Sequence, residues 1–306
     1  MAIAAVMKKK VVQISTLLSI AVVFGGGFSR LATRASTVSV ERDTFFSSTV
    51  ETLAQARITP PVPPLPASIP TPRIPDVEGI IGLIPTPEDD IGVGHLRPRD
   101  TSFLNSSDSA ANSLLGAGWL QSAAIPIYIE PNGMHWGWII NGWLVPNSQT
   151  PIALGQDASF SMLQAYTALS SFPVMQIRED GWFEFQYTPA GRAWAHVDHL
   201  NLGSLDLAVE LWESHFVGTG EVEFRRHGLS QALYGAPAST QTNVLGLVGP
   251  ESQIQPIAFE GDWMRVQVTQ PTAGCTPLPG AVIREGWMRW RSDEAQSLVW
   301  ITAEGC

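Results

Sequence analysis

The residues that could do chemistry are few, and the sequence does not assemble them into a recognisable catalytic site. Cys275 lies in a proline-rich loop and Cys306 is the last residue, so neither begins a helix that would activate its thiol. No G-x-S-x-G segment is present, so a serine hydrolase of that kind has no support. Asp89 and Asp90 fall in a linker that offers no rigid frame for a carboxylate pair. We therefore predict that the protein is not an enzyme.

The nearest approach to a metal-binding pattern is His196-Val197-Asp198-His199, with His135 as a further candidate. On a strand, His196 and Asp198 share one face while His199 points to the other, so the spacing does not indicate a tetrahedral ligand set. Polar residues that close the end of a β module account for the cluster better. We predict no metal and no cofactor, and near-stoichiometric zinc in the purified protein would contradict this.

Charged residues are distributed very unevenly along the chain. All three lysines lie at positions 8 to 10, so Schiff-base chemistry, a Ser-Lys dyad and a P-loop lysine are excluded from everything that follows. After residue 35 the chain has 13 Arg against 28 Asp and Glu, a formal net charge of −15. Because phosphate neutralisation needs a basic face, we predict no nucleic-acid partner.

The N-terminus has the layout of an export signal. Residues 8 to 10 are followed by about 18 mostly apolar residues without a charge and then by Arg30 and Arg34. Small residues at 33 and 35 allow cleavage after Ala35, but the apolar core is also long enough for a retained anchor. We predict export to the periplasm or the extracellular space, with residues 1–35 as the only membrane contact, and leave cleavage and anchoring open.

Only two cysteines are present, Cys275 and Cys306. In an exported chain, a disulfide between them would close a loop of roughly thirty residues and contribute about 3 to 4 kcal/mol. Two unpaired thiols in a reducing cytoplasm are the alternative. We predict the disulfide.

Residues 36–110 read as a disordered proline-rich spacer. Eleven prolines lie between residues 59 and 98, in runs such as PPVPPLP and IPTPRIP. Such a composition favours extended polyproline II backbone that separates a folded part from a membrane. A second interpretation makes the segment a ligand for a groove that binds proline-rich chains, on another protein or on this one.

The remaining sequence predicts a mainly β fold in two modules, residues 111–202 and residues 203–306. Gly261-Asp262 precedes the alternating strand that begins at Trp263, and a rough copy with Asp180-Gly181 before Trp182 lies 81 residues upstream. Asn141-Gly142 is a strong turn dipeptide. Two helices are also expected: a short one that begins at Asp157, and a connecting helix at residues 204–216, where strand alternation is the alternative.

The second module resembles the bacterial Src-homology-3 family over about residues 230–301. The segments that carry the resemblance are YGAPAS, VLGLVGPESQIQPIAFEGDWMRVQV and EGWMRW. The first module, from IPIY to HVDHL, looks like a divergent relative. The resemblance implies two tandem small Src-homology-3-like β-barrels that bind cell-wall peptides or proteins, although the chain has no attached hydrolase and its cysteine-containing insert is atypical.

Aromatic residues supply the candidate ligand-binding positions. Trp287 and Trp290 are three residues apart on one predicted strand, so they cannot both face inward. The exposed one, beside Tyr234, would line a groove for extended peptide or glycan. Tyr128 and Trp194 are the candidates in the first module.

These features predict an exported, non-enzymatic envelope protein. Its tandem barrels would bind a peptide, a glycan or a protein partner, with peptidoglycan or an envelope protein as the expected target. The alternative is an accessory or assembly subunit that docks on a membrane complex. Because the chain is acidic, attraction to an anionic wall by charge alone is not expected.

Overall fold

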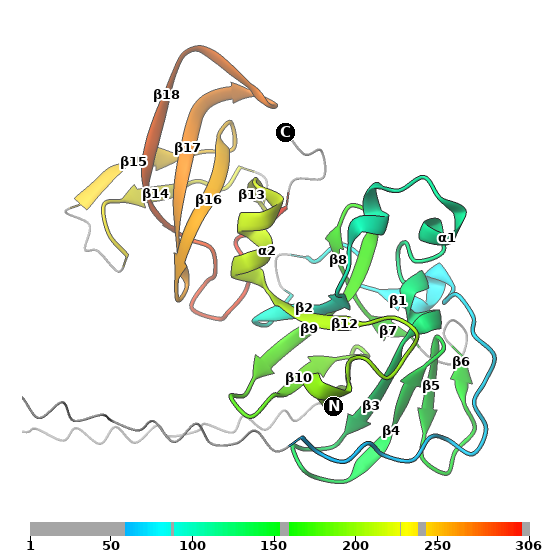
Figure 1. Cartoon of the computed structure of the whole chain (residues 1–306). Coiled ribbons are helices and arrows are strands. Elements are labelled where there is room, and N and C mark those ends of the chain that lie inside the picture. Colours follow the sequence, from blue (N-terminus) through cyan, green and yellow to red (C-terminus); the bar gives the residue numbers. More distant parts are fainter. Residues whose placement is uncertain (1–58, 87–88, 154–158, 227, 238–242, 302–306) are drawn as a thin grey trace, which may run out of the picture. The chain divides into compact units, whose positions relative to one another are not determined.

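A computed structural model describes residues 59–86, 89–153, 159–226, 228–237 and 243–301. The predicted export signal, the first part of the predicted spacer and Cys306 lie outside this range, so the predictions made for them remain predictions. The described chain is mainly β, as predicted, with several antiparallel sheets (Figure 1). None of the helices in the described part is both long and apolar enough to cross a membrane.

The larger sheet has ten strands, and every pair in it is antiparallel. Its buried side contributes the aromatic and aliphatic side chains of one large core. Across the sheet the order is β12 (Leu207–Leu211), β2 (Gly94–Pro98), β9 (Leu169–Ile177), β10 (Trp182–Gln186), β11 (Arg192–His196), β3 (Ala124–Tyr128), β4 (His135–Ile140), β5 (Trp143–Pro146) and β6 (Ile152–Ala153), and β8 (Leu163–Tyr166) pairs with β9 outside this order.

A second sheet of seven antiparallel strands contains the C-terminal module. In the described residues both sheets are open: β12 and β6 end the larger sheet, to which β8 adds a further edge, and β15 and β19 end the second. The order is β15 (Val244–Val248), β14 (Gln231–Tyr234), β18 (Thr276–Arg289), β17 (Trp263–Ala273), β16 (Gln253–Glu260), β13 (Val222–Phe224) and β19 (Val299–Ile301). The remaining elements are the parallel pair β1 (Ile80–Ile81) and β7 (Phe160–Ser161), the helices α1 (Ser109–Asn112) and α2 (Trp212–Thr219), and the 3-10 turns Val77–Gly79, Ser102–Asn105, Gly118–Ser122 and Val197–His199.

The predicted turns and hairpins are present. β4 ends at Ile140 and β5 begins at Trp143, and Asn141 and Gly142 between them have φ of 55° and 80°, as a two-residue hairpin turn requires. Glu260 pairs with Trp263 across the turn at Gly261-Asp262, so β16, β17 and β18 form the predicted strands around Trp263.

Both helix predictions need correction. The segment after Asp157 forms no helix where it is described; β8 turns back on β9 instead, with Leu163 opposite Ser171. The predicted connecting helix is half strand, because β12 pairs with β2 up to Leu211 and α2 begins only at Trp212. In both places the hydrogen bonds of a neighbouring strand decide the structure over the local helical pattern.

The predicted spacer also differs from the structure. Gly94–Pro98 is strand β2, which lies between β12 and β9 in the larger sheet, so a spacer that extends to residue 110 is wrong. Upstream, residues 59–76, called the arm below, lie along the same sheet (Figure 1, blue) rather than apart from it. The second interpretation of this segment, a ligand for a surface of its own chain, describes these contacts better.

Candidate functional site

The arm is held by side chains that donate hydrogen bonds to its backbone carbonyls. The indole Nε1 of Trp138 donates to Pro64 O at 3.2 Å, and that of Trp143 donates to Thr71 O at 3.0 Å. Extended polyproline II backbone has no internal hydrogen bonds, so its carbonyls are available to such donors. Two further donations of the same kind are from Asn141 Nδ2 to Pro70 O (3.0 Å) and from His199 Nε2 to Pro60 O (3.0 Å).

The arm crosses the tip of the β4–β5 hairpin at very short range. Arg73 N donates to Asn141 O at 3.1 Å, and the Arg73 guanidinium lies 5.2 Å from the Trp143 ring centre. A Cβ at Gly142 would lie 2.2 Å from Arg73 O. Only glycine fits this position, because it supplies both the positive φ and the space for the arm.

The second sheet carries a similar set of aromatic groups on its outer face. Tyr234 is directly opposite Trp287, and the ring of Trp263 meets that of Tyr234 edge-on at 5.5 Å. The register also places Arg265 opposite Trp287 and Arg289 opposite Trp263, so all five side chains share one face. Each of the three rings is half-buried, so this face presents aromatic surface without a described segment lying along it.

The other candidate aromatic residues do not form a surface of this kind. Trp290 is 1% exposed, and its Nε1 donates to Gly261 O at 2.9 Å, so the prediction that it lines a groove is wrong. Trp290 packs in the core because it lies two residues after buried Met288, and side chains two residues apart on an extended chain face the same side. Tyr128 is also buried, and only its partner Trp194, which lies opposite it, is half-buried.

The histidines predicted from the sequence as candidate ligands, His135, His196 and His199, make structural hydrogen bonds near the ends of their strands. His196 Nε2 donates to Asp180 O at 2.9 Å and its Nδ1 accepts from Asp198 N at 3.2 Å, so both nitrogens are bonded to backbone. His199 holds the arm through Nε2, and His135 pairs with Asn147. Within the described residues these side chains do not converge on a common point as metal ligands would.

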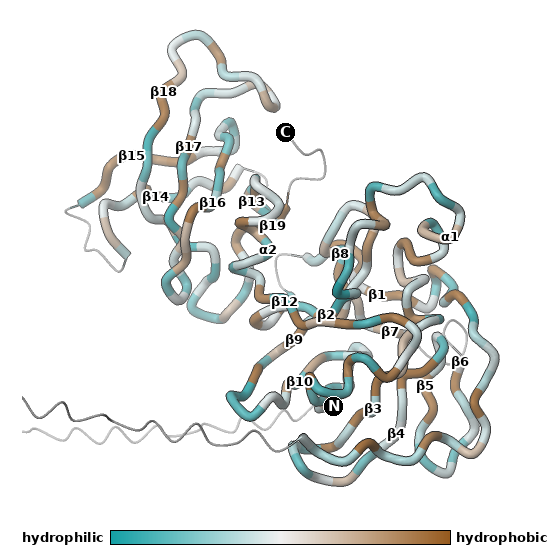
Figure 2. The backbone as a smooth tube through the Cα atoms, in the orientation of Figure 1, coloured by the Kyte–Doolittle hydropathy of each residue, from teal (hydrophilic) through white to brown (hydrophobic). Residues whose placement is uncertain are grey.

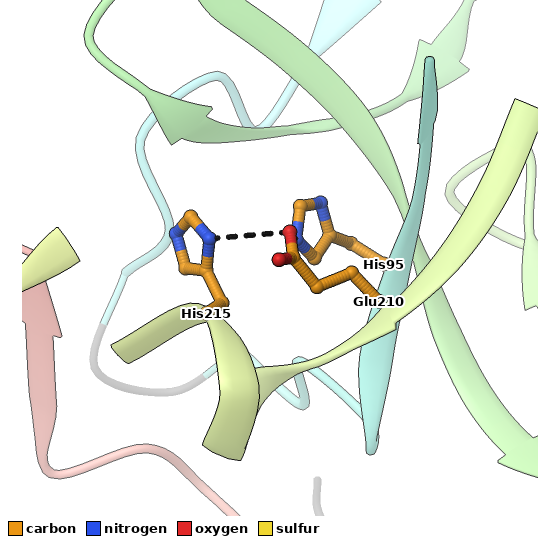
Figure 3. A group of neighbouring side chains, drawn as sticks. All are labelled: His95, Glu210 and His215. Carbon is orange, nitrogen blue, oxygen red and sulfur yellow. Dashed lines mark hydrogen bonds and ion pairs between the residues drawn. The ribbon is translucent and has the colours of Figure 1, made fainter. Parts of the chain in front are cut away.

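A different cluster does converge, and its members come from three elements. His95 of β2, Glu210 of β12 and His215 of α2 point toward one another (Figure 3), with one donor or acceptor atom from each within 4.8 Å of the others. His95 and Glu210 are directly opposite each other across the β2–β12 ladder. A Cβ at Gly94 would lie 2.3 Å from Glu210 O, so glycine allows this close pairing.

The start of α2 fixes the third member. Trp212 N donates to Val93 O at 3.1 Å and its Nε1 donates to Ile91 O at 2.8 Å. The Trp212 ring stacks on His95 at 4.5 Å with an interplanar angle of 8°. His215 and Phe216, three and four residues after Trp212, lie on the same helical face and are buried with it.

Glu210 Oε2 is the electrostatic centre of the cluster. It accepts hydrogen bonds from His95 Nε2 at 2.9 Å, Arg97 Nε at 2.6 Å and Tyr166 OH at 3.0 Å. His215 Nδ1 lies 3.5 Å away, and neither nitrogen of His215 makes a hydrogen bond to a described residue although both are buried. Such orphaned buried polar atoms are uncommon in native proteins.

Burial and these contacts set the charge states. Burial lowers the pKa of His95 to about 4, and its hydrogen bond to Glu210 offsets this only in part. Burial raises the pKa of Glu210, but the contacts from His215, His95 and Arg97 outweigh it and hold that pKa well below its usual range. At neutral pH Glu210 is therefore ionised and His95 neutral, so His95 donates from Nε2 and accepts from Ser171 Oγ at Nδ1, 2.9 Å away.

Sequence reasoning did not find this cluster. His95 lies in the stretch that its prolines marked as spacer, and 115 residues separate it from Glu210. The only local signal is the pair Glu210 and His215 at the strand-to-helix junction, and a predicted helix over that junction concealed it.

Comparison with known proteins adds no assignment. No protein-family model, no curated protein and no solved structure matches the chain.

Proposed function

We propose that the protein is an exported, non-enzymatic envelope binding protein whose β modules bind extended peptide segments. The first module holds its own proline-rich arm, and the second binds a segment of another protein. The observation that carries this proposal is the arm itself, whose carbonyls accept hydrogen bonds from Trp138, Asn141 and Trp143. Aromatic-lined grooves recognise polyproline II chains in this manner, because the preformed backbone loses little entropy on binding.

The aromatic face of the second sheet, formed by Tyr234, Trp263 and Trp287, suits such a ligand. Aromatic rings offer large apolar contact area together with a polar edge that can bond a carbonyl. Arg265 and Arg289 border the rings, and their charges are matched by Glu285 and Asp262 on the same sheet. The face is therefore close to neutral, which favours an apolar or proline-rich segment over a strongly charged one.

The remaining parts of the proposal follow from the sequence. The tandem Src-homology-3-like barrels, the export of the chain and the disulfide between Cys275 and Cys306 fit a binding module that works in the cell envelope. The first module would be the divergent relative that keeps its ligand in the same chain.

A peptide titration tests the proposal. A fluorescent peptide of residues 59–76 is added to the purified full chain and its anisotropy is followed. Saturable binding is expected, and Trp287→Ala or Tyr234→Ala should weaken it about tenfold, the equivalent of 1.4 kcal/mol. Val282→Ala, an exposed position on the same strand whose side chain points to the other face, is the control. Binding that Trp287→Ala leaves unchanged would remove the second face from the proposal.

One observation favours the alternative, an accessory subunit that docks on a membrane complex. The edge strand β15 exposes Val244, Leu245 and Leu247 (44%, 45% and 66% exposed) and is coloured as hydrophobic over most of its length (Figure 2). An apolar edge strand is a template for pairing with another protein. Retention of the chain on purified peptidoglycan at moderate salt would favour the binding module, and co-purification with one membrane complex would favour the alternative.

A further inference from the structure

We propose that His95, Glu210 and His215 bind one divalent transition-metal ion, with zinc as the expected occupant, and that the ion ties α2 to strands β2 and β12. This site is separate from the two peptide-binding faces, so the inference does not depend on the proposed function. It replaces the prediction, made from His196 and His199, that the chain holds no metal.

The donor set defines the class of ion. Two imidazoles and one carboxylate suit zinc and its neighbours in the first transition row, whereas calcium and magnesium prefer oxygen ligands alone. Three protein ligands are the number that many zinc sites use together with a fourth, exchangeable ligand. Tyr166 borders the same cluster, because its OH lies 3.0 Å from Glu210 Oε2 and its ring meets that of His215 at 4.6 Å.

The spacing of the atoms fits one small ion. At zinc–ligand distances near 2.0 to 2.1 Å, two ligands of a tetrahedral site lie about 3.3 Å apart. Glu210 Oε2 is 2.9 Å from His95 Nε2 and 3.5 Å from His215 Nδ1, on either side of that value, and all three ligand atoms lie within 4.8 Å of one another. The strand ladder and the start of α2 already fix all three side chains, so little further ordering would be needed on binding.

His215 provides the independent reason to expect a ligand. Its side chain is almost completely buried and points at Glu210 (Figure 3). Its Nδ1 lies 3.5 Å from Glu210 Oε2, an ion-pair contact that is too long for a good hydrogen bond, and its buried Nε2 has no hydrogen-bond partner within the described chain. Folding normally provides a partner for a buried polar atom. A metal ion between His215 and Glu210 would supply one.

Ser171 allows His95 to change from donor to ligand. A metal takes the lone pair of Nε2, which requires the proton to be on Nδ1, and Nδ1–H can then donate to Ser171 Oγ at the distance already present, 2.9 Å. Ligating histidines are commonly fixed by such a partner on the second nitrogen. The same serine therefore satisfies both tautomers.

The positive charge of Arg97 opposes a cation at this site. Its guanidinium donates to Glu210 and also to the carbonyl oxygens of Pro98 and Arg99, at 2.6 and 2.9 Å, so several acceptors share its charge. Arg97, His95 and Tyr166 all donate to the same oxygen, Glu210 Oε2, so an ion bound by this oxygen would take the position that the His95 proton holds now and would compete with the Arg97 bond. Arg97→Gln is therefore expected to tighten metal binding.

Metal loading of the purified full chain tests the proposal. After EDTA treatment and dialysis, the chain is titrated with Co²⁺ and with Zn²⁺, and metal content and the visible absorption of Co²⁺ are measured. One ion per chain is expected, with the absorption of a low-coordinate cobalt site and a rise in melting temperature. His215→Gln should abolish all three signals, whereas His135→Gln should retain them.

The choice of His215 keeps the test decisive. Because its nitrogens make no hydrogen bond to a described residue, His215→Gln is expected to fold, and equal melting of the wild type and this variant in EDTA would verify it. Glu210→Gln serves as the second variant. A folded wild type that takes up no cobalt or zinc would overturn the proposal, as would equal uptake by His215→Gln.

Discussion

The two β modules carry similar aromatic surfaces, but only one of them is covered by a described segment. On the larger sheet, Trp138 and Trp143 donate their indole N–H groups to the arm. On the smaller sheet, Tyr234, Trp263 and Trp287 are half-buried against one another, and no described segment lies along them. A segment of the same chain therefore occupies the first surface, whereas the second carries no described segment.

The arm is bound to the first sheet by some of its residues, while others remain exposed. The arm buries Pro60, Pro63 and Pro75 while Val62, Leu65 and Ile69 point outward. The carbonyls of the arm accept hydrogen bonds from the sheet, and these exposed aliphatic side chains do not pack against it. The arm is therefore held by hydrogen bonds to its carbonyls and by the burial of these prolines.

The largest expected effect on stability is that of Trp290→Ala, and it distinguishes buried Trp290 from half-buried Trp287 on β18. Trp290→Ala removes a fully buried ring and its bond to Gly261 O, and should lower the free energy of unfolding by about 3 to 5 kcal/mol. Chemical denaturation followed by tryptophan fluorescence measures this. A loss below about 1 kcal/mol would show that Trp290 is not part of the core and would restore it as a surface candidate.

A second substitution would uncover the first surface. Gly142→Ala places a Cβ 2.2 Å from Arg73 O at a residue with φ of 80°, so it should displace the arm and destabilise the chain by more than the 1 to 2 kcal/mol of a strained φ alone. Gly228→Ala is the matched control, because its φ is 75° and nothing lies within 4 Å of the added atom. Equal destabilisation by the two variants would contradict the close crossing of the arm.

Acid should loosen the arm at its other end, where His199 Nε2 donates to Pro60 O. Burial lowers the pKa of His199, its bond to Pro60 O offsets this in part, and His196 and Asp198 act in opposite directions. Since the unfolded chain then takes up a proton more readily than the folded chain, stability is fully present above the unfolded pKa of about 6.5 and is lost as the pH falls below it. Burial also lowers the pKa of the nearby His135, which adds an effect of the same sign.

The contribution of His199 to this pH dependence can be isolated. In His199→Gln the amide can still donate to Pro60 O but does not titrate, so melting temperatures between pH 7 and pH 5 should fall less steeply than in the wild type. Identical slopes would show that His199 does not report on the arm.

The smallest stability effect is expected on the second surface. Trp287→Ala truncates a half-buried ring and should change the free energy of unfolding by about 1 kcal/mol or less, while peptide binding weakens about tenfold. Thermal melts run beside the anisotropy titration compare the two. A stability loss as large as that of Trp290→Ala would mean that Trp287 has a structural role and would erase the contrast between the surfaces.

Local signals in the sequence predicted the parts of the fold that depend on local chemistry. Asn141-Gly142 forms its turn because few other residues accept positive φ at both positions, and the Gly261-Asp262 turn sets the register of β17. Both are decided within a few residues, so the sequence is sufficient.

The parts that failed depend on pairing between distant segments. Leu163 to Leu169 has a helical pattern, but β8 gains a ladder with β9, and Leu207 to Leu211 gains one with β2. His95 was concealed for the same reason, since a short strand within a proline-rich stretch has no signature until β9 and β12 pair with it. The cluster of His95, Glu210 and His215 forms because β2 pairs with β12 in one particular register, and that pairing cannot be read from a single sequence.

Trypsin cleavage after Arg73 tests the docked arm most directly. Arg73 is the only lysine or arginine between residues 59 and 86, so the Arg73–Ile74 bond reports on the arm alone. Proteolysis tracks the population of the open form, so cleavage in the full chain should be far slower than in a free peptide of residues 59–86. Gly142→Ala should raise the cleavage rate of the full chain much of the way toward that of the free peptide. Equal rates in the wild-type chain and the free peptide would contradict the account.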